Sequence, residues 1–280
     1  MINNFLLLPV LIPLLFGIAV MIASSLKFKA TWIAILGGAF TAIASVSVLF
    51  QAQELGAYAY HFGNWPAPFG IVFVADVLAG LMISVSSLMG FSILIYGSHE
   101  LKDRKSYGLY LAFILILLAS INGAFLTGDI FNLYVWFEVM LISSFALMVM
   151  DSDKKQIIGS VQYVILNLIS TMIFLLAIGI LYGHTGSLNM ADLHYKAAEL
   201  STWTKSSLMS LFFIGFAIKA SLFPFYAWVP AAYPKLPNTI LAFFAGLLTK
   251  VGVYAMLRVF TLIFPLNSVD GWTYFFGIVA

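Results

Sequence analysis

Long apolar stretches alternate with short polar segments along the whole chain. Each stretch is close to the roughly 20 residues that a helix needs to cross the hydrocarbon core of a bilayer. We place eight such spans at 5–25, 30–50, 72–97, 109–126, 130–150, 158–182, 207–228 and 238–258. A ninth span begins near Trp272 and runs to the last residue, so we expect the chain to be a fragment.

Composition also indicates a membrane protein. Hydrophobic residues make up 62% of the chain and charged residues 9%, against about 45–50% and about 25% in soluble domains. The apolar runs are continuous rather than alternating, which favours helices over a membrane β-barrel. The sequence therefore predicts an all-α fold, a polytopic membrane helical bundle with eight full transmembrane helices and the start of a ninth.

Charge and cysteine content remove several classes of function. The formal net charge of +2 is too small to predict a nucleic-acid partner. The chain has no cysteine, which excludes disulfides, thiolate metal sites and cysteine catalysis. The first apolar stretch starts at Phe5 with no basic segment before it, so we interpret it as a retained span rather than a signal peptide.

The basic residues predict the orientation. Most Lys and Arg residues follow the odd-numbered spans and therefore lie on one side of the membrane. The other side carries Lys196, Lys205 and Arg258. Because short basic loops stay in the cytoplasm, the N-terminus is predicted to lie outside. The residues that follow the first, third, fifth and seventh spans are Lys27, Lys29, Lys102, Arg104, Lys105, Lys154, Lys155 and Lys235.

Two loops on the predicted outer side have an interfacial character. Residues 51–71 are rich in tyrosine, tryptophan and proline, and residues 187–200 have the pattern of a short amphipathic helix that lies on the surface. Neither loop shows a catalytic pattern. We therefore interpret both as structural.

Three ionisable residues lie in the interior of apolar spans. Glu138, Lys219 and Lys250 are each within about two turns of the middle of a predicted span. An ionised side chain costs roughly 2.5–3.5 kcal/mol at the centre of a membrane helix on insertion scales. Three such charges in one chain indicate ion or proton movement. The alternative is a static ion pair that fixes helix packing.

A buried Glu–Lys pair has the chemistry for proton transfer. Burial favours the neutral form of each group and an opposite charge favours the ionised form, so a pair can change protonation as it opens and closes. Lysine suits this role because arginine stays protonated. Polar side chains at similar depths would hold water beside the pair: Asn132, Ser143, Ser144, Gln162, Asn167, Ser170, Thr171 and Thr249.

Proline interrupts the seventh span. Pro224 removes a backbone hydrogen bond and clashes with the preceding turn, so we predict a helix break there. A carbonyl freed at membrane depth must face protein or water, and broken helices are typical of transporter sites. The alternative is a kink without a transport role.

Two aspartates precede spans in positions typical of helix caps. Asp76 starts the third span and Asp129 the fifth, where a carboxylate accepts backbone N–H bonds. None of the four histidines lies in a span. No cluster has the pattern of a metal site, a nucleophilic triad or a phosphate loop, so we expect no metal and no cofactor.

Three segments resemble the proton-translocating antiporter-like family. They are residues 127–138 (TGDIFNLYVWFE), 216–230 (FAIKASLFPFYAWVP) and 247–258 (LLTKVGVYAMLR). The family contains the large antiporter subunits of respiratory complex I and of Mrp-type multisubunit sodium/proton antiporters. Many complex I relatives carry histidines where this sequence has Tyr226 and Tyr233, so the resemblance is closest to the Mrp branch.

The resemblance implies roles and an architecture. Glu138 would pair with Lys219 on a broken seventh helix, and Lys250 would pass the proton onward. The family fold has two inverted five-helix repeats after three N-terminal helices. Here that implies an N-terminal segment at 1–107, the first repeat at 108–260 and a truncated second repeat at 261–280.

We therefore expect a proton-translocating subunit of a sodium/proton antiporter rather than an enzyme. It would be driven by proton motive force in a bacterial cytoplasmic membrane. Its partners would be other antiporter subunits, protons, sodium and lipid, with no nucleic acid. Two alternatives stay open, namely the corresponding subunit of a quinone- or hydrogenase-linked redox complex, and a non-conducting assembly subunit.

Overall fold

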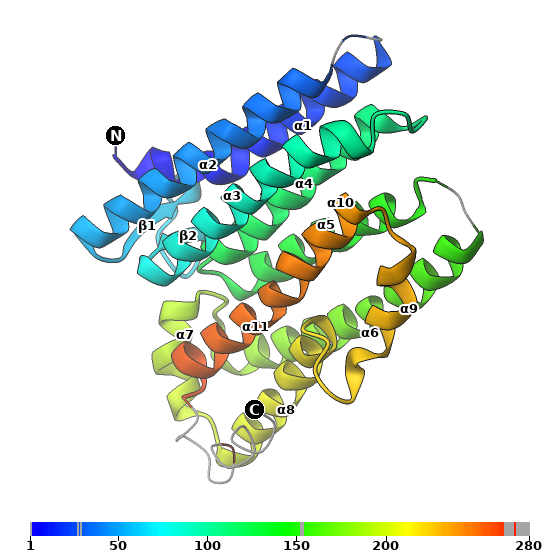
Figure 1. Cartoon of the computed structure of the whole chain (residues 1–280). Coiled ribbons are helices and arrows are strands. Elements are labelled where there is room, and N and C mark those ends of the chain that lie inside the picture. Colours follow the sequence, from blue (N-terminus) through cyan, green and yellow to red (C-terminus); the bar gives the residue numbers. More distant parts are fainter. Residues whose placement is uncertain (1, 27, 29, 152–153, 266–271, 273–280) are drawn as a thin grey trace.

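The structure is a bundle of long helices that run roughly alongside one another (Figure 1). This computed structural model describes residues 2–26, 28, 30–151, 154–265 and 272. Seven helical segments in this part of the chain are long and apolar enough to cross a membrane. They confirm the predicted class of polytopic helical membrane protein.

Six of these segments are built on single helices. A 3-10 helix, Ile2–Leu7, leads into the first of them. The six helices are α1 (Leu8–Ser25), α2 (Ala30–Leu55), α3 (Val77–Glu100), α4 (Tyr107–Leu126), α5 (Ile130–Val149) and α6 (Lys154–Thr185).

The seventh segment, Asn238–Ile263, changes its winding twice. It begins as α10 (Asn238–Phe243), passes through a π-helical turn (Phe244–Leu248), continues as α11 (Thr249–Arg258) and ends in a second π-helical turn (Val259–Ile263). Single π turns inside helices are often found at functional sites. One of these turns directly precedes Thr249 and Lys250, and the other directly follows Arg258.

Helices α1 to α4 form the first half of the bundle (Figure 1). Helix α4 is the most enclosed, with 83% of its central residues buried. Its Asn122 donates to Pro9 O of α1 (2.9 Å) and to Ser87 Oγ of α3 (3.1 Å), and accepts from Ser86 Oγ (2.6 Å). Ser87 in turn bonds Ser45 Oγ of α2 at 2.7 Å. One buried network therefore ties all four helices.

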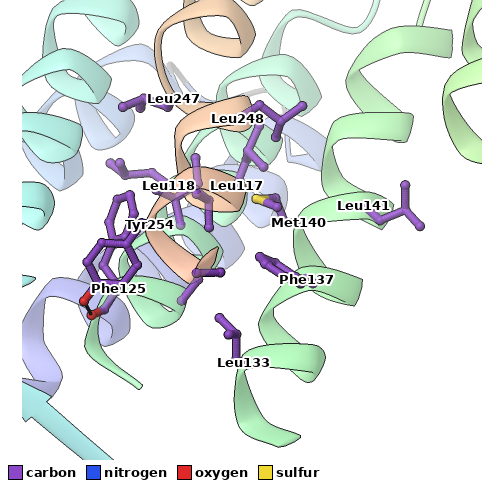
Figure 2. Packing of buried hydrophobic residues seen from close by; sticks show 14 of the residues in the cluster. Leu117, Leu118, Phe125, Leu133, Phe137, Met140, Leu141, Leu247, Leu248 and Tyr254 are labelled. Atoms are coloured by element: carbon purple, nitrogen blue, oxygen red, sulfur yellow. Dashed lines mark hydrogen bonds between the residues drawn. The ribbon is translucent and has the colours of Figure 1, made fainter. Parts of the chain in front are cut away.

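A second group of helices packs around phenylalanine side chains. It comprises α5, α6, α8 (Thr202–Lys219) and the short α9 (Trp228–Ala232). Phe174 of α6 lies 5.0 Å from Phe216 of α8 and 5.7 Å from Phe137 of α5, measured between ring centroids. Figure 2 shows how leucines of α4 and of the segment before α11 interleave with α5 around Phe137 and Met140.

One end of the bundle is closed by a small hairpin. Strands β1 (Tyr58–His61) and β2 (Val72–Ala75) pair antiparallel. We predicted a helix over 72–97, and its first residues are strand instead. The helix starts after Asp76, whose side chain accepts the Ala79 N–H at 2.8 Å. The β-branched residues before Asp76 suit a strand, and the cap fixes where the helix begins.

Two further predictions at this end are confirmed. Asp129 caps α5 by accepting the Asn132 N–H at 2.7 Å. The amphipathic segment predicted at 187–200 forms α7 (Met190–Lys196) and a 3-10 turn (Ala197–Glu199). It is joined to the bundle by backbone bonds, among them Met190 N to Gly128 O at 2.9 Å.

The opposite end gathers loops that the charge pattern had assigned to one side. Arg104, after α3, forms an ion pair with Asp151, after α5. Glu100 of α3 accepts the backbone N–H groups of Asn238 (3.0 Å) and Thr239 (2.7 Å), which caps the first turn of α10. These contacts place three of the loops predicted to be cytoplasmic at the same end.

The predicted seventh span, 207–228, is interrupted, as Pro224 indicated, but the start of the helix and the position of the break differ from the prediction. Helix α8 starts earlier, at Thr202, and ends at Lys219, five residues before Pro224. It is not among the seven segments long and apolar enough to span a membrane in the described residues. The predicted ninth span lies outside the described residues apart from Trp272.

Replacing Asn122 by leucine should destabilise the bundle. The change keeps the number and branching of the side-chain heavy atoms but removes three hydrogen bonds from a fully buried site. We expect a loss of about 1–2 kcal/mol in the free energy of unfolding, seen as a fall in Tm of the detergent-solubilised protein. Ser92→Ala is the control, because that exposed hydroxyl bonds only the Leu88 carbonyl. An unchanged Tm for Asn122→Leu would show that the network contributes nothing.

Candidate functional site

The break after α8 interrupts the predicted seventh span. After Lys219 the chain closes with a tight turn in which Ala220 N bonds Phe216 O (2.7 Å) and Leu222 N bonds Ala217 O (2.9 Å). Ser221 takes a left-handed conformation with φ 53°, which a serine rarely adopts. The helix therefore ends at the lysine itself.

A tryptophan satisfies a carbonyl at this break. The C-terminal end of a helix leaves carbonyls without intrahelical partners, which is costly where no water reaches. Trp228 of α9 is 1% exposed, and its indole N–H donates to Ile218 O at 2.9 Å. Helix α9, which packs on α6, thus covers the end of α8 beside Lys219 with its first residue.

Lys219 is held in an enclosed position. The residue is 4% exposed, and its Nζ lies 4.7 Å from the ring centroid of Phe137 on α5. An ammonium over an aromatic face gains a cation–π interaction. The negative end of the α8 dipole also favours a cation there. Both effects compensate part of the cost of burying the charge.

Glu138 follows Phe137 on α5 and is half-buried. Its charge acts on Lys219. Among the described residues, however, the ion pairs are Arg104–Asp151, Lys196–Asp192 and Arg258–Asp76, so Glu138 and Lys219 are not in direct contact. The structure brings these two predicted partners into one region, where the Lys219 ammonium lies against the ring of Phe137, the neighbour of Glu138 on α5.

Lys250 faces away from this region. Its side chain is exposed, and Nζ donates to Ala245 O in the preceding π turn at 2.5 Å. No hydrogen bond or ion pair joins Lys250 to Lys219 or Glu138 in the part of the chain that is described. The structure therefore places Lys250 on the surface of this chain and not in the enclosed site.

A close backbone contact explains the direction of Lys250. A Cβ on Gly252 would lie 2.7 Å from Ala220 N and 3.1 Å from the Lys219 carbonyl carbon. Helix α11 therefore presents Gly252 to the break in α8. Lys250 precedes it by two residues, about half a turn, and must point to the other side.

The predicted supporting polar residues fall into separate places. Asn132 lies in the α5 cap and donates to Thr127 Oγ1 (2.9 Å), while Ser143 bonds carbonyls of its own helix. Ser144 Oγ and Tyr163 OH are 2.7 Å apart, and Asn167 donates to Tyr163 O (3.0 Å). Thr249 is half-buried next to Lys250.

Two aromatic residues of this region were not singled out from the sequence as polar partners. Tyr163 is buried, and its ring centroid lies 5.2 Å from that of Trp228. Tyrosine and tryptophan count as largely apolar in a hydropathy pattern. Their hydrogen bonds become visible only in the structure, where Ser144 faces Tyr163 and the Ile218 carbonyl faces Trp228. The predicted polar residue Ser144 indicates this place, since its hydroxyl faces that of Tyr163.

The chemistry of the site rests on ionisable side chains. In the described residues no group of three or more His, Cys, Asp or Glu is placed to hold a metal ion. What the site offers is one buried amine, one half-buried carboxylate and a broken helix that joins them to a polar cluster on α5 and α6.

Comparison with known proteins identifies relatives over almost the whole chain. A family model described as "NADH:quinone oxidoreductase/Mrp antiporter, TM" matches residues 127–280. The D-type Na(+)/H(+) antiporter subunit from Alkalihalophilus pseudofirmus is 38% identical over 99% of this chain and 58% of that protein. Its counterpart of the same name from Bacillus subtilis is 37% identical over 94% of this chain and 53% of that protein. The chain thus spans just over half the length of these curated relatives.

Two solved structures share the fold. A chain of the membrane-bound sulfane sulfur reductase, an archaeal respiratory membrane complex, superposes with a TM-score of 0.91 at 27% identity, covering 99% of this chain and 56% of that one. A chain of the Mrp complex from Dietzia sp. DQ12-45-1b superposes with a TM-score of 0.85 at 30% identity, covering 97% and 51%. On the strength of the family match, this multi-pass membrane chain belongs to the NADH:quinone oxidoreductase/Mrp antiporter family.

Proposed function

We propose that this chain provides the proton-translocating part of a subunit in a multisubunit monovalent cation/proton antiporter. Proton motive force would drive sodium out of a bacterial cell across its cytoplasmic membrane, with the N-terminus of the chain outside. The observation that carries the proposal is the buried Lys219 at the break of α8, facing the α5 turn that holds Glu138. A buried amine without a contacting counter-ion is poised to exchange its proton.

Glu138 and Lys219 act as the switching pair. The Lys219 ammonium lies against the Phe137 ring, and the Glu138 charge acts on it without a direct ion pair. Closing the distance would favour both ionised forms, and opening it would favour both neutral forms. Small movements of the α8 end therefore couple helix position to protonation.

Lys250 is the onward relay. An exposed ammonium in the interior of a membrane span is costly against lipid. The curated relatives are longer than this chain, and we infer that the α11 face bearing Lys250 is covered there by further protein. In that assembly Lys250 passes the proton from the repeat at 108–260 towards the covering helices. Other antiporter subunits, protons, sodium and lipid are the partners of such a complex.

A redox-linked complex is the second candidate. The match to a chain of an archaeal respiratory membrane complex supports it. In such an assembly the same residues would move protons, and a partner would supply the energy by electron transfer. The identity to the antiporter subunits is higher, so we place the antiporter first.

Neutralising Glu138 should abolish transport. We expect Glu138→Gln to lose sodium-driven proton exchange, because a glutamine can neither release a proton nor attract the Lys219 charge. The measurement is the response of a pH-sensitive dye in everted vesicles that carry the whole complex at matched amounts. Glu54→Gln, the same change at an exposed position of α2, is the matched control. Unchanged exchange in Glu138→Gln would favour a non-conducting assembly role. A wild-type complex that shows no exchange would favour the redox-linked one.

Replacing Lys219 by arginine tests protonation rather than charge. Arginine keeps the positive charge and its cation–π contact but does not release its proton. We expect the exchange rate to fall by at least about 100-fold, the size of a lost acid–base step, while the complex still assembles. Lys196→Arg on α7, which keeps an exposed ion pair with Asp192, is the control. Normal exchange in Lys219→Arg would mean that the site needs only a fixed cation.

A further inference from the structure

A second polar constellation lies at the hairpin end of the bundle. A cavity of about 510 Å³ opens there between the β1–β2 hairpin, the turn before α5, α7 and the end of α11. Its polar lining includes His61, Asp76, Asn189, His194 and Arg258. The charge pattern of the loops predicts that this end faces outside.

An ion pair forms part of the cavity wall. Arg258 donates to both carboxylate oxygens of Asp76, at 2.6 and 2.5 Å. Burial raises the pKa of Asp76, but the hydrogen bonds from Arg258 and from the Ala79 N–H outweigh it and hold that pKa below its ordinary value. The carboxylate is therefore ionised at neutral pH. A two-bond Arg–carboxylate contact is strong and fixed in geometry.

The ion pair continues into the bundle through Tyr254. Arg258 Nε donates to Tyr254 OH at 2.8 Å, and that hydroxyl donates to Phe125 O of α4 at 2.7 Å. Tyr254 is 6% exposed, and Figure 2 shows its ring lying against Phe125. While the ion pair is intact, the Tyr254 hydroxyl thus accepts a hydrogen bond from Arg258 and donates one to Phe125 O.

The same face of α11 leads to Lys250. Lys250, Tyr254 and Arg258 are spaced four residues apart, so they form one row along the helix. The Lys250 ammonium donates to Ala245 O and not to the Tyr254 hydroxyl. A change of the Lys250 side-chain rotamer would bring the ammonium towards the hydroxyl.

We propose that this cavity is an external vestibule for protons and that the Asp76–Arg258 pair is the gate between the vestibule and Lys250. The inference rests on the proposed function. In the closed state Arg258 occupies both the Asp76 carboxylate and the Tyr254 hydroxyl. When the pair separates, Asp76 takes a proton from the vestibule or gives one to it, and Tyr254 becomes available to Lys250.

Proton leakage tests the gate. Right-side-out vesicles with the whole complex are given a pH gradient in the absence of sodium, and its decay is followed. We expect Asp76→Asn and Arg258→Gln to speed the decay about tenfold, because breaking one partner of a largely buried pair weakens the closed state. Asparagine still caps α3. Lys196→Gln, which removes an exposed ion pair at the same end, should leave the decay unchanged.

Thiol labelling tests the vestibule without relying on transport. The chain has no cysteine, so each introduced thiol is unique in it. Ala191→Cys, in the cavity lining, should react with a membrane-impermeant maleimide from outside and not from inside. Lys250→Cys should resist the reagent from outside and become about tenfold more reactive when combined with Asp76→Asn.

The outcomes separate the gate from the proposed function. Labelling of Ala191→Cys from the inside alone would overturn the external vestibule. Rapid labelling of Lys250→Cys with the ion pair intact, or no change in decay and labelling when Asp76 is neutralised, would show that the pair is a static link. Failure of the Glu138–Lys219 mechanism appears instead as normal exchange in Glu138→Gln, and the labelling measurements do not depend on exchange.

Discussion

The need to satisfy every backbone polar group inside a bilayer governs this structure. A helix that ends at membrane depth leaves carbonyls that no water can reach. Here the end of α8 is covered by α9, whose Trp228 takes the Ile218 carbonyl. Lys219 therefore lies beside a helix terminus whose carbonyl is hydrogen-bonded, and the helix dipole stabilises a cation there. The position of the buried amine is thus a consequence of how the break is satisfied.

The separation of Glu138 and Lys219 follows from the same arrangement. In a medium of low dielectric, a direct ion pair would be tight and slow to exchange protons, whereas fully isolated charges would be too costly. The Phe137 ring gives the Lys219 ammonium an intermediate environment, because it offers a cation–π contact in place of a direct ion pair. The ring contacts the ammonium and belongs to the phenylalanine cluster that fixes α5 against α6 and α8.

Sequence patterns predicted some of these features and missed others for physical reasons. The number and order of most spans follow from hydropathy, and Glu138 and Lys219 stand out because charges are rare in such segments. Pro224 indicated a break but not its position, because the helix ends where Ser221 adopts a left-handed turn. The hairpin at Tyr58–His61 and Val72–Ala75 was not predicted. Four-residue strands next to a long apolar run carry little periodicity of their own.

The direction of Lys250 could not be predicted from hydropathy, because the packing of α11 sets it. Gly252 allows α11 to approach the α8 break closely, and the same contact turns Lys250 outward. Tyr254 and Arg258 continue the Lys250 row towards the hairpin end, where Asp76 closes it. One helix therefore contacts the backbone at the α8 break with one face and presents a row of polar groups on another. The same helix thus borders both polar regions, the α8 break through Gly252 and the cavity at the hairpin end through Arg258.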